Sequence, residues 1–210
     1  ITRVDAGGKV QSAETLNILT IDNSYGDMPD NCVNEPLPHL LKAEKDIAND
    51  LAPLVWVYPM REFTTAHSEE ALYEMYFGDK YISEAINNGF PLNCVVSTDN
   101  FLKTPLELYE KSILISPIPQ TKEIADRLSR FEKAGGNVIY YGSVKASEHL
   151  ENKENFIDFT ASPSAIREKL SDFGYCIKFE RKSDEIKPNA LTVSRVDNAL
   201  TFSVYSPNIT

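Results

Sequence analysis

The serine that follows a strongly apolar run, in the stretch YYGSVKA (residues 140–146), is the candidate nucleophile of this chain. The turn after a buried strand is where α/β enzymes carry nucleophiles and ligand-binding loops. A nucleophile elbow has the form Gly-x-Ser-x-Gly, but here a single glycine directly precedes Ser143 and the bulky Val144 follows it. A serine also needs a base, and His149 is the only histidine after Ser143. The pattern favours a strand-end turn residue over a nucleophile.

A second group of polar residues follows the predicted strands and could bind a ligand. Its members share one feature: each comes just after an apolar run, and the carboxyl ends of parallel strands form the usual ligand crevice of an α/β sheet. They are Arg61, Asp99, Asn100, Gln120 and Ser143. We expect this edge to be a polar ligand-binding surface, for example for a sugar, or an interface, and ordinary loop polarity is the alternative.

Other chemistry finds little support in the sequence. Three cysteines at long spacings predict no disulfide framework, and the absence of a Cys-x-x-Cys or His-x-x-x-His pair predicts no metal site. Gly135-Gly136 lies between a helix and a strand rather than before a helix, so it predicts no phosphate cradle. Carboxylate pairs such as Glu69/Glu70 are typical of solvated helix faces. We therefore predict no cofactor.

Composition limits the class of partner. The 210 residues carry a formal net charge of −10, and their Lys and Arg are scattered, which argues against nucleic acid and anionic membranes as partners. No run approaches the length of a membrane span. Because the chain begins with Ile1, we expect an internal piece of a longer polypeptide. Its compartment stays undecided, with a slight preference for the cytoplasm, because any signal peptide would lie upstream.

The elements that position these residues alternate along the chain. Apolar runs predict strands and amphipathic runs predict helices, and Asp197-Asn198 sits between two alternating runs as a hairpin turn. Alternation of this kind predicts an α/β fold, a flavodoxin-like doubly wound and mostly parallel sheet, with a C-terminal antiparallel hairpin. The expected strands are residues 15–22, 53–59, 92–98, 112–119, 137–143 and 175–180; the expected helices are 39–52, 68–89, 104–111, 120–136 and 162–174.

Three regions follow from these elements. Residues 1–50 are predicted to be a loop-rich N-terminal extension with a short helix. Residues 51–182 are predicted to form the α/β domain. Residues 183–210 are predicted to form a hairpin, either at the sheet edge or at the start of a following β module.

The stretch from residue 113 to residue 143 resembles a known family. It combines an apolar strand ending in proline, a helix of the form A-x-R-L-x-x-F-x-x-A-G-G, and a second apolar strand; Ala125, Arg127, Leu128, Phe131, Ala134, Gly135 and Gly136 carry the pattern. It is similar to the glutamine-amidotransferase-like (trimerisation-type) domain of β-galactosidase-type multidomain glycoside hydrolases. The run LVWVYPMREF (54–63) resembles the opening strand of that domain, and the likeness extends over about residues 50–210.

The resemblance implies a non-catalytic role. Class I glutamine amidotransferases carry a cysteine nucleophile at the turn where this chain has Gly142-Ser143, so no catalytic residue is expected. The family implies an accessory domain of a bacterial carbohydrate-active enzyme that packs against other domains of its polypeptide or forms homo-oligomers, and that could line a sugar cleft. The alternatives are a small hydrolase or amidotransferase-like enzyme using Ser143, and a carbohydrate-binding module.

Overall fold

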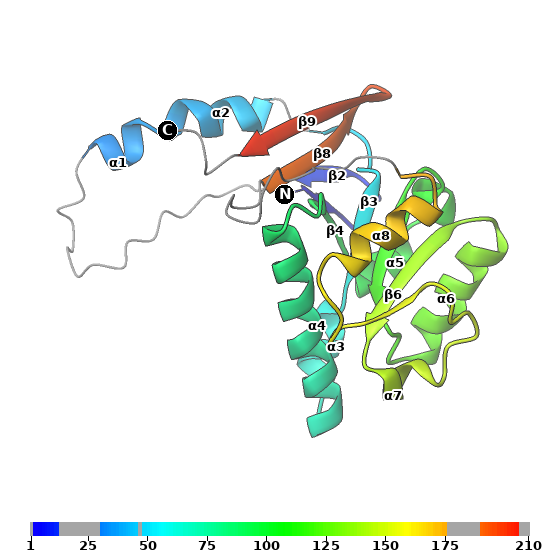
Figure 1. Ribbon diagram of the computed structural model, residues 1–210. Helices are drawn as coiled ribbons and strands as arrows, with labels where there is room; N and C mark the ends of the chain where they lie inside the picture. Colours follow the sequence, from blue (N-terminus) through cyan, green and yellow to red (C-terminus); the bar gives the residue numbers. More distant parts are fainter. Residues whose placement is uncertain (1, 13–29, 46–47, 176–189, 206–210) are drawn as a thin grey trace.

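The computed structural model describes residues 2–12, 30–45, 48–175 and 190–205, which form one main sheet with helices on both faces, a separate hairpin, and two helices within residues 30–45 that lie away from the main sheet (Figure 1). The strands are β1 (Thr2–Val4), β2 (Val10–Ser12), β3 (Leu54–Tyr58), β4 (Cys94–Ser97), β5 (Ile113–Pro117), β6 (Asn137–Gly142), β7 (Phe156–Asp158), β8 (Ala190–Val196) and β9 (Ala199–Tyr205). The helices are α1 (Asn31–Asn34), α2 (Leu37–Lys45), α3 (Met60–Thr65), α4 (Glu69–Asn87), α5 (Thr98–Lys103), the 3₁₀ helix η1 (Leu106–Tyr109), α6 (Lys122–Lys133), α7 (Val144–Ser147) and α8 (Ala165–Asp172).

The main sheet has seven strands in the order β2-β1-β4-β3-β5-β6-β7. Every neighbouring pair is parallel except β1 and β2. The order reverses at β3: the chain first moves to β4 on one side and then crosses to β5 on the other. The α/β class and the mostly parallel sheet predicted from the sequence are confirmed.

The central strands are buried on both faces. On one face, Val55 and Leu114 pack with α5, η1 and α6; on the other, Leu54 and Ile115 pack with α4 and α8. Because successive side chains of a strand point to opposite faces, a strand covered on both sides must be apolar throughout. This accounts for the unbroken apolar runs in the sequence.

The Ala-Gly-Gly end of α6 has a packing explanation. Gly135 adopts a φ of 93°, the left-handed conformation that ends many helices. At Gly136 an added Cβ would collide with the ring of Phe131, which is buried in the core. Arg127, also buried, stacks over the Phe101 ring with its guanidinium carbon 5.0 Å from the ring centroid, and it donates a hydrogen bond to the carbonyl of Thr104. These residues join α6 to its neighbours.

The C-terminal hairpin β8–β9 is confirmed and forms its own two-stranded sheet. Asp197 and Asn198 have φ values of 47° and 66°, as a two-residue type I′ turn requires. The hairpin is fastened to the amino-end edge of the main sheet. The Oδ1 of Asn93 accepts from the backbone N–H of Val193 at 3.2 Å, and the Arg195 guanidinium donates to the carbonyl of Leu51 at 3.1 Å.

Some elements differ from the expectation. The three-residue strands β1 and β2, within the predicted N-terminal extension, join the main sheet, and β7, which was not predicted, pairs with β6 at the edge of the described sheet. Strands of three residues are too short to show the alternation of apolar and polar side chains by which a strand is recognised in a sequence. The strand predicted at 15–22 and nearly all of the one at 175–180 lie outside the described residues.

Replacing Gly136 tests the packing explanation. We expect Gly136→Ala to lower the free energy of unfolding by about 1–3 kcal/mol because the new methyl overlaps the Phe131 ring. In a Phe131→Leu background the same change should cost less, since the ring is gone. Gly135→Ala is the control: its cost of about 1–2 kcal/mol comes from φ alone and should be the same in both backgrounds. Urea unfolding measures the free energy of unfolding of each variant. An equal loss for Gly136→Ala in both backgrounds would show that the Phe131 ring is not what excludes a side chain at position 136.

Candidate functional site

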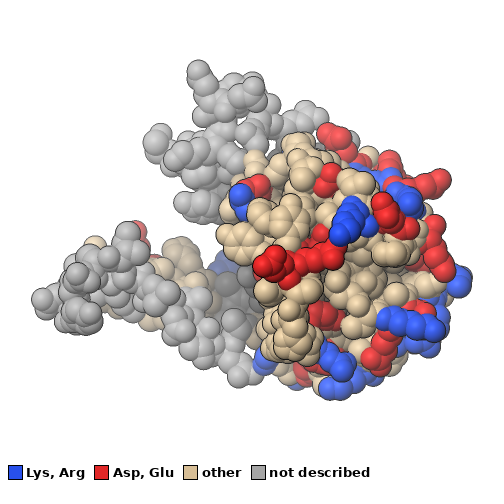
Figure 2. All heavy atoms as spheres, turned by 90° about the horizontal axis from the view of Figure 1, so that it is seen from below, with Lys and Arg blue, Asp and Glu red and all other residues tan. Residues whose placement is uncertain are grey.

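The loops after β3, β4, β5 and β6 meet at the carboxyl-end edge of the sheet, the lower end of the molecule in Figure 1. Seen from that end, acidic and basic side chains are interspersed with uncharged surface (Figure 2). The strand order reverses between β3 and β5, and in open α/β sheets ligands bind outside such a switch point. The candidate site is therefore the group of side chains on the β3, β4 and β5 loops.

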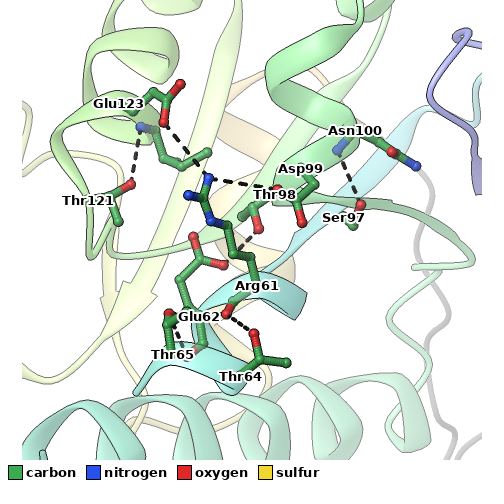
Figure 3. A network of polar contacts seen from close by, with 11 residues as sticks. Arg61, Glu62, Thr64, Thr65, Ser97, Thr98, Asp99, Asn100, Thr121 and Glu123 are labelled. Carbon is green, nitrogen blue, oxygen red and sulfur yellow. Dashed lines mark hydrogen bonds and ion pairs between the residues drawn. The ribbon is translucent and has the colours of Figure 1, made fainter. Parts of the chain in front are cut away.

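Arg61, on α3, is the centre of a charged network at this edge (Figure 3). Its Nη1 lies 3.8 Å from Asp99 Oδ1 on α5 and 4.0 Å from Glu123 Oε2 on α6. All three side chains are largely exposed, and exposed ion pairs at such distances contribute little stability. The structure thus brings the predicted Arg61 and Asp99 together, in a geometry that leaves the guanidinium accessible.

Glu62 lies beneath this network and is buried, with 7% of its surface exposed. Its Oε2 accepts a hydrogen bond from the Thr98 hydroxyl at 2.7 Å. Glu62 and Thr98 line an open hollow of about 260 Å³ on the Arg61 side and a cavity of about 20 Å³ on the inner side. A cavity of that size holds about one water molecule, so a ligand could contact this site only from the outer hollow.

Ser143 is held by local hydrogen bonds. Its Oγ accepts from the backbone N–H of Ala146 at 3.2 Å and so caps α7, and its own N–H donates to Glu74 Oε2 on α4 at 2.9 Å. The neighbouring Gly142 leaves room for this carboxylate, because a Cβ there would lie 3.1 Å from Glu74 Oε2 and 2.6 Å from Ile118 Cδ1. Within the described residues no histidine is hydrogen-bonded to Ser143. The hydroxyl is placed as a helix cap rather than as an activated nucleophile.

The other two predicted residues turn away from the network. Asn100 donates from Nδ2 to the carbonyl of Val4 at 3.0 Å and thereby joins α5 to β1. Gln120 donates from Nε2 to the carbonyl of Ile118 at 3.1 Å within its own loop, and it lines the small inner cavity. Of the five predicted residues, the structure pairs Arg61 with Asp99 and places the other three in separate local contacts.

Two carboxylates at this edge were missed by the sequence analysis, Glu62 and Glu74. A usable signal existed for Glu74, which stands four and seven residues before Gly78 and Tyr81, both on the buried stripe of α4. A charged residue on the core-facing stripe of a helix indicates a fixed polar contact. Glu62 gave no comparable periodic signal, because α3 is only six residues long.

Tyr58, the last residue of β3, joins the edge of the sheet to α4. Its hydroxyl donates to Asp79 Oδ2 at 2.9 Å. Burial, together with the hydrogen bond to Asp79 and the charge of that carboxylate, raises the pKa of Tyr58 to about 12. Burial also raises the pKa of Asp79, and the hydrogen bond from Tyr58 partly offsets that increase. The pair is a positioning contact for α4.

Candidate metal ligands do not cluster in the part of the chain that the structure describes. No three His, Cys, Asp or Glu side chains there are grouped so that they could hold a metal ion.

Among the described helices none is long and apolar enough to cross a membrane.

Comparisons of the chain with family models, with curated proteins and with solved structures found no match. The family resemblance of residues 113–143 therefore stays a prediction. The function has to be argued from the residues of this chain.

Removing the Thr98 hydroxyl tests the Glu62 contact. We expect Thr98→Val to lower the free energy of unfolding by about 1–3 kcal/mol, because a buried carboxylate then loses its donor. The double variant Glu62→Gln/Thr98→Val should recover part of that loss. Thr64→Val, at an exposed threonine of α3, should have little effect. If Thr98→Val unfolds at the same urea concentration as the parent, the contact is unimportant.

The raised pKa of Asp79 predicts a pH dependence. The folded protein holds this proton more tightly than the unfolded chain, so the Asp79 contribution to stability is lost as pH rises from about 4 through the folded pKa. Asp79→Asn keeps an acceptor for Tyr58 and removes the titration. We expect its stability relative to the parent to increase between about pH 4 and pH 7, measured by urea unfolding at several pH values. A constant difference would rule out the raised pKa.

Proposed function

We propose that this chain is a non-catalytic packing domain of a larger carbohydrate-active enzyme of the glycoside hydrolase type, with a flavodoxin-like core. The strand order β4-β3-β5-β6-β7 supports the core assignment, because it corresponds to the doubly wound order 2-1-3-4-5. The link to glycoside hydrolases rests on the resemblance of residues 113–143 alone.

An exposed aromatic cluster on α4 is the observation that carries the packing role. Tyr73 and Tyr76 are 48% and 66% exposed, and they contact Phe77 with ring centroids 4.5 and 5.2 Å apart. Phe159, after β7, extends the cluster, with its centroid 5.8 Å from Tyr73. We call these four residues, together with the exposed Leu72, the aromatic patch.

The aromatic patch has the chemistry of a protein interface. Tyrosine and phenylalanine are enriched at such interfaces, because they provide a large apolar area with little side-chain entropy to lose. Clusters of exposed apolar side chains rimmed by polar residues commonly mark interaction sites. On the same helix as the aromatic patch, Glu70 in the first turn of α4 forms an exposed ion pair, 2.7 Å long, with Lys145 of α7. A second copy of the chain, presenting the same patch, is the occupant we propose.

The strand-end geometry is consistent with the non-catalytic part of the proposal. Ser143 Oγ caps α7, and Glu74, the carboxylate that contacts this turn, accepts from a backbone N–H instead of orienting a base. Hydrolytic use of a serine needs a general base in contact with the hydroxyl. A fluorophosphonate probe, which labels activated serines, should leave Ser143 unmodified; labelling there would overturn the non-catalytic assignment.

Sedimentation velocity over a range of concentrations tests the interface. We expect the parent chain to self-associate, and Leu72→Ser/Tyr76→Ser to shift it towards the monomer by about tenfold or more in dissociation constant, since aromatic anchors dominate many interfaces. Leu41→Ser is the matched control, because Leu41 is similarly exposed on α2 and lies outside the aromatic patch. A parent chain that is monomeric throughout, or one dissociated only by Leu41→Ser, would contradict the proposal.

A further inference from the structure

A groove of about 550 Å³ lies between the outer side of α6 and the segment that follows α7. It is separate from the Arg61 network, although both adjoin α6. Its volume falls in the range of small-molecule sites, about 300–1,000 Å³, whereas the cavity beside Glu62 holds about 20 Å³. A hollow of about 510 Å³ between β7 and α8 is of similar size but is much more open, so the groove beside α6 is the better enclosed of the two.

A fixed carboxylate forms part of the groove lining. Glu132, at the end of α6, accepts a hydrogen bond from the Tyr140 hydroxyl on β6 at 3.0 Å. Its other oxygen accepts from Asn152 Nδ2 at 3.4 Å, across the groove. Partial burial raises the pKa of Glu132, and the nearby charge of Glu151 adds to the increase. A carboxylate held from two sides keeps free lone pairs for further donors, so it is a preorganised acceptor.

Donors are available on both walls. Arg130 and Lys133 lie on α6, and His149 lies on the opposite segment. Within the described residues the side chains of these three make no hydrogen bond or ion pair with the protein. They can therefore serve a ligand without first breaking an internal contact.

The balance of charge indicates the class of ligand. The lining contains two cationic side chains, Arg130 and Lys133, and three carboxylates, those of Asp126, Glu132 and Glu151. This balance disfavours phosphates and other strong anions, which require an excess of cationic groups. Apolar surface from Ile118, Pro119 and Leu150 adjoins the polar groups. Alternating donors, acceptors and small apolar areas match a neutral molecule with many hydroxyl groups.

We propose that the groove between α6 and residues 149–152 binds a neutral sugar, with Glu132 accepting from its hydroxyls and Arg130 and His149 donating to them. The proposal does not rest on the aromatic patch, which lies on α4. It gives the chain a binding activity in addition to its packing role.

Saturation-transfer difference NMR tests the proposal directly. The probes are glucose, galactose, mannose, xylose, cellobiose and lactose, each added to the intact chain, with the dissociation constant of any positive probe taken from titration calorimetry. We expect at least one sugar to bind and inorganic phosphate not to displace it. Binding by none of the six sugars, or displacement by phosphate, would overturn the assignment.

Variants locate the bound sugar. Arg130→Ala and Glu132→Gln should each weaken binding by about tenfold or more, the effect of losing one hydrogen bond that involves a charged group. Lys122→Ala, an exposed cation on the same helix but outside the groove, is the matched control and should bind as the parent does. Circular dichroism confirms that each variant is folded. Equal binding by Arg130→Ala and Lys122→Ala would place the sugar elsewhere.

The same experiment separates this proposal from the packing role. Leu72→Ser/Tyr76→Ser should keep its affinity for the sugar while it loses self-association. Sugar binding that disappears with the aromatic patch would assign the sugar to α4 and overturn the groove.

Discussion

Burial of the central strands on both faces is the constraint on which the rest of this molecule depends. With α4 and α8 on one side and α5 and α6 on the other, β3, β5 and β6 are mostly apolar on both faces, and their buried polar atoms, such as Ser116 Oγ and the Tyr141 hydroxyl, are hydrogen-bonded within the protein. Charged side chains are consequently found beyond the two ends of these strands. Asn93 and Arg195 fasten the hairpin at the amino ends, and Arg61 and Glu62 gather at the carboxyl ends.

Carboxylates connect the layers of the fold. On α4, Asp79 binds Tyr58 at the end of β3, and Glu74 binds the N–H of Ser143 just after β6. On the opposite layer, Glu132 of α6 binds Tyr140 of β6. Each contact joins a helix to the sheet through a charge-assisted or partly buried hydrogen bond, which is stronger than a neutral surface one. The acidic residues nearest the core therefore fix the positions of helices, whereas those at the rim, such as Asp99 and Glu70, form exposed ion pairs.

The sequence predicted the regular part of this fold because that part follows from periodicity. The apolar runs of β3 to β6, the capped stripes of α4 and α6, and the Asp197-Asn198 turn are each encoded locally. The short strands β1, β2 and β7 are determined by tertiary pairing with β4 and β6, which a local pattern cannot contain. The same limit applies to the site. The placement of Arg61 and Asp99 at one edge followed from their positions just after strands, whereas their pairing and the burial of Glu62 depend on how α3, α5 and α6 pack.

Strand β9 of the hairpin has an exposed apolar face and an unpaired backbone edge in the described sheet. Leu200, Phe202 and Val204 occupy alternate positions of β9 and so share one face, and all three are exposed. In the described sheet β9 pairs only with β8, so its outer backbone edge is unpaired there. The strand ALTFSVY (199–205) contains neither a lysine nor a proline, the residues that commonly protect such edges. An apolar strand with an open edge is a template for cross-β stacking, so this hairpin is the segment at which aggregation of the concentrated protein would begin.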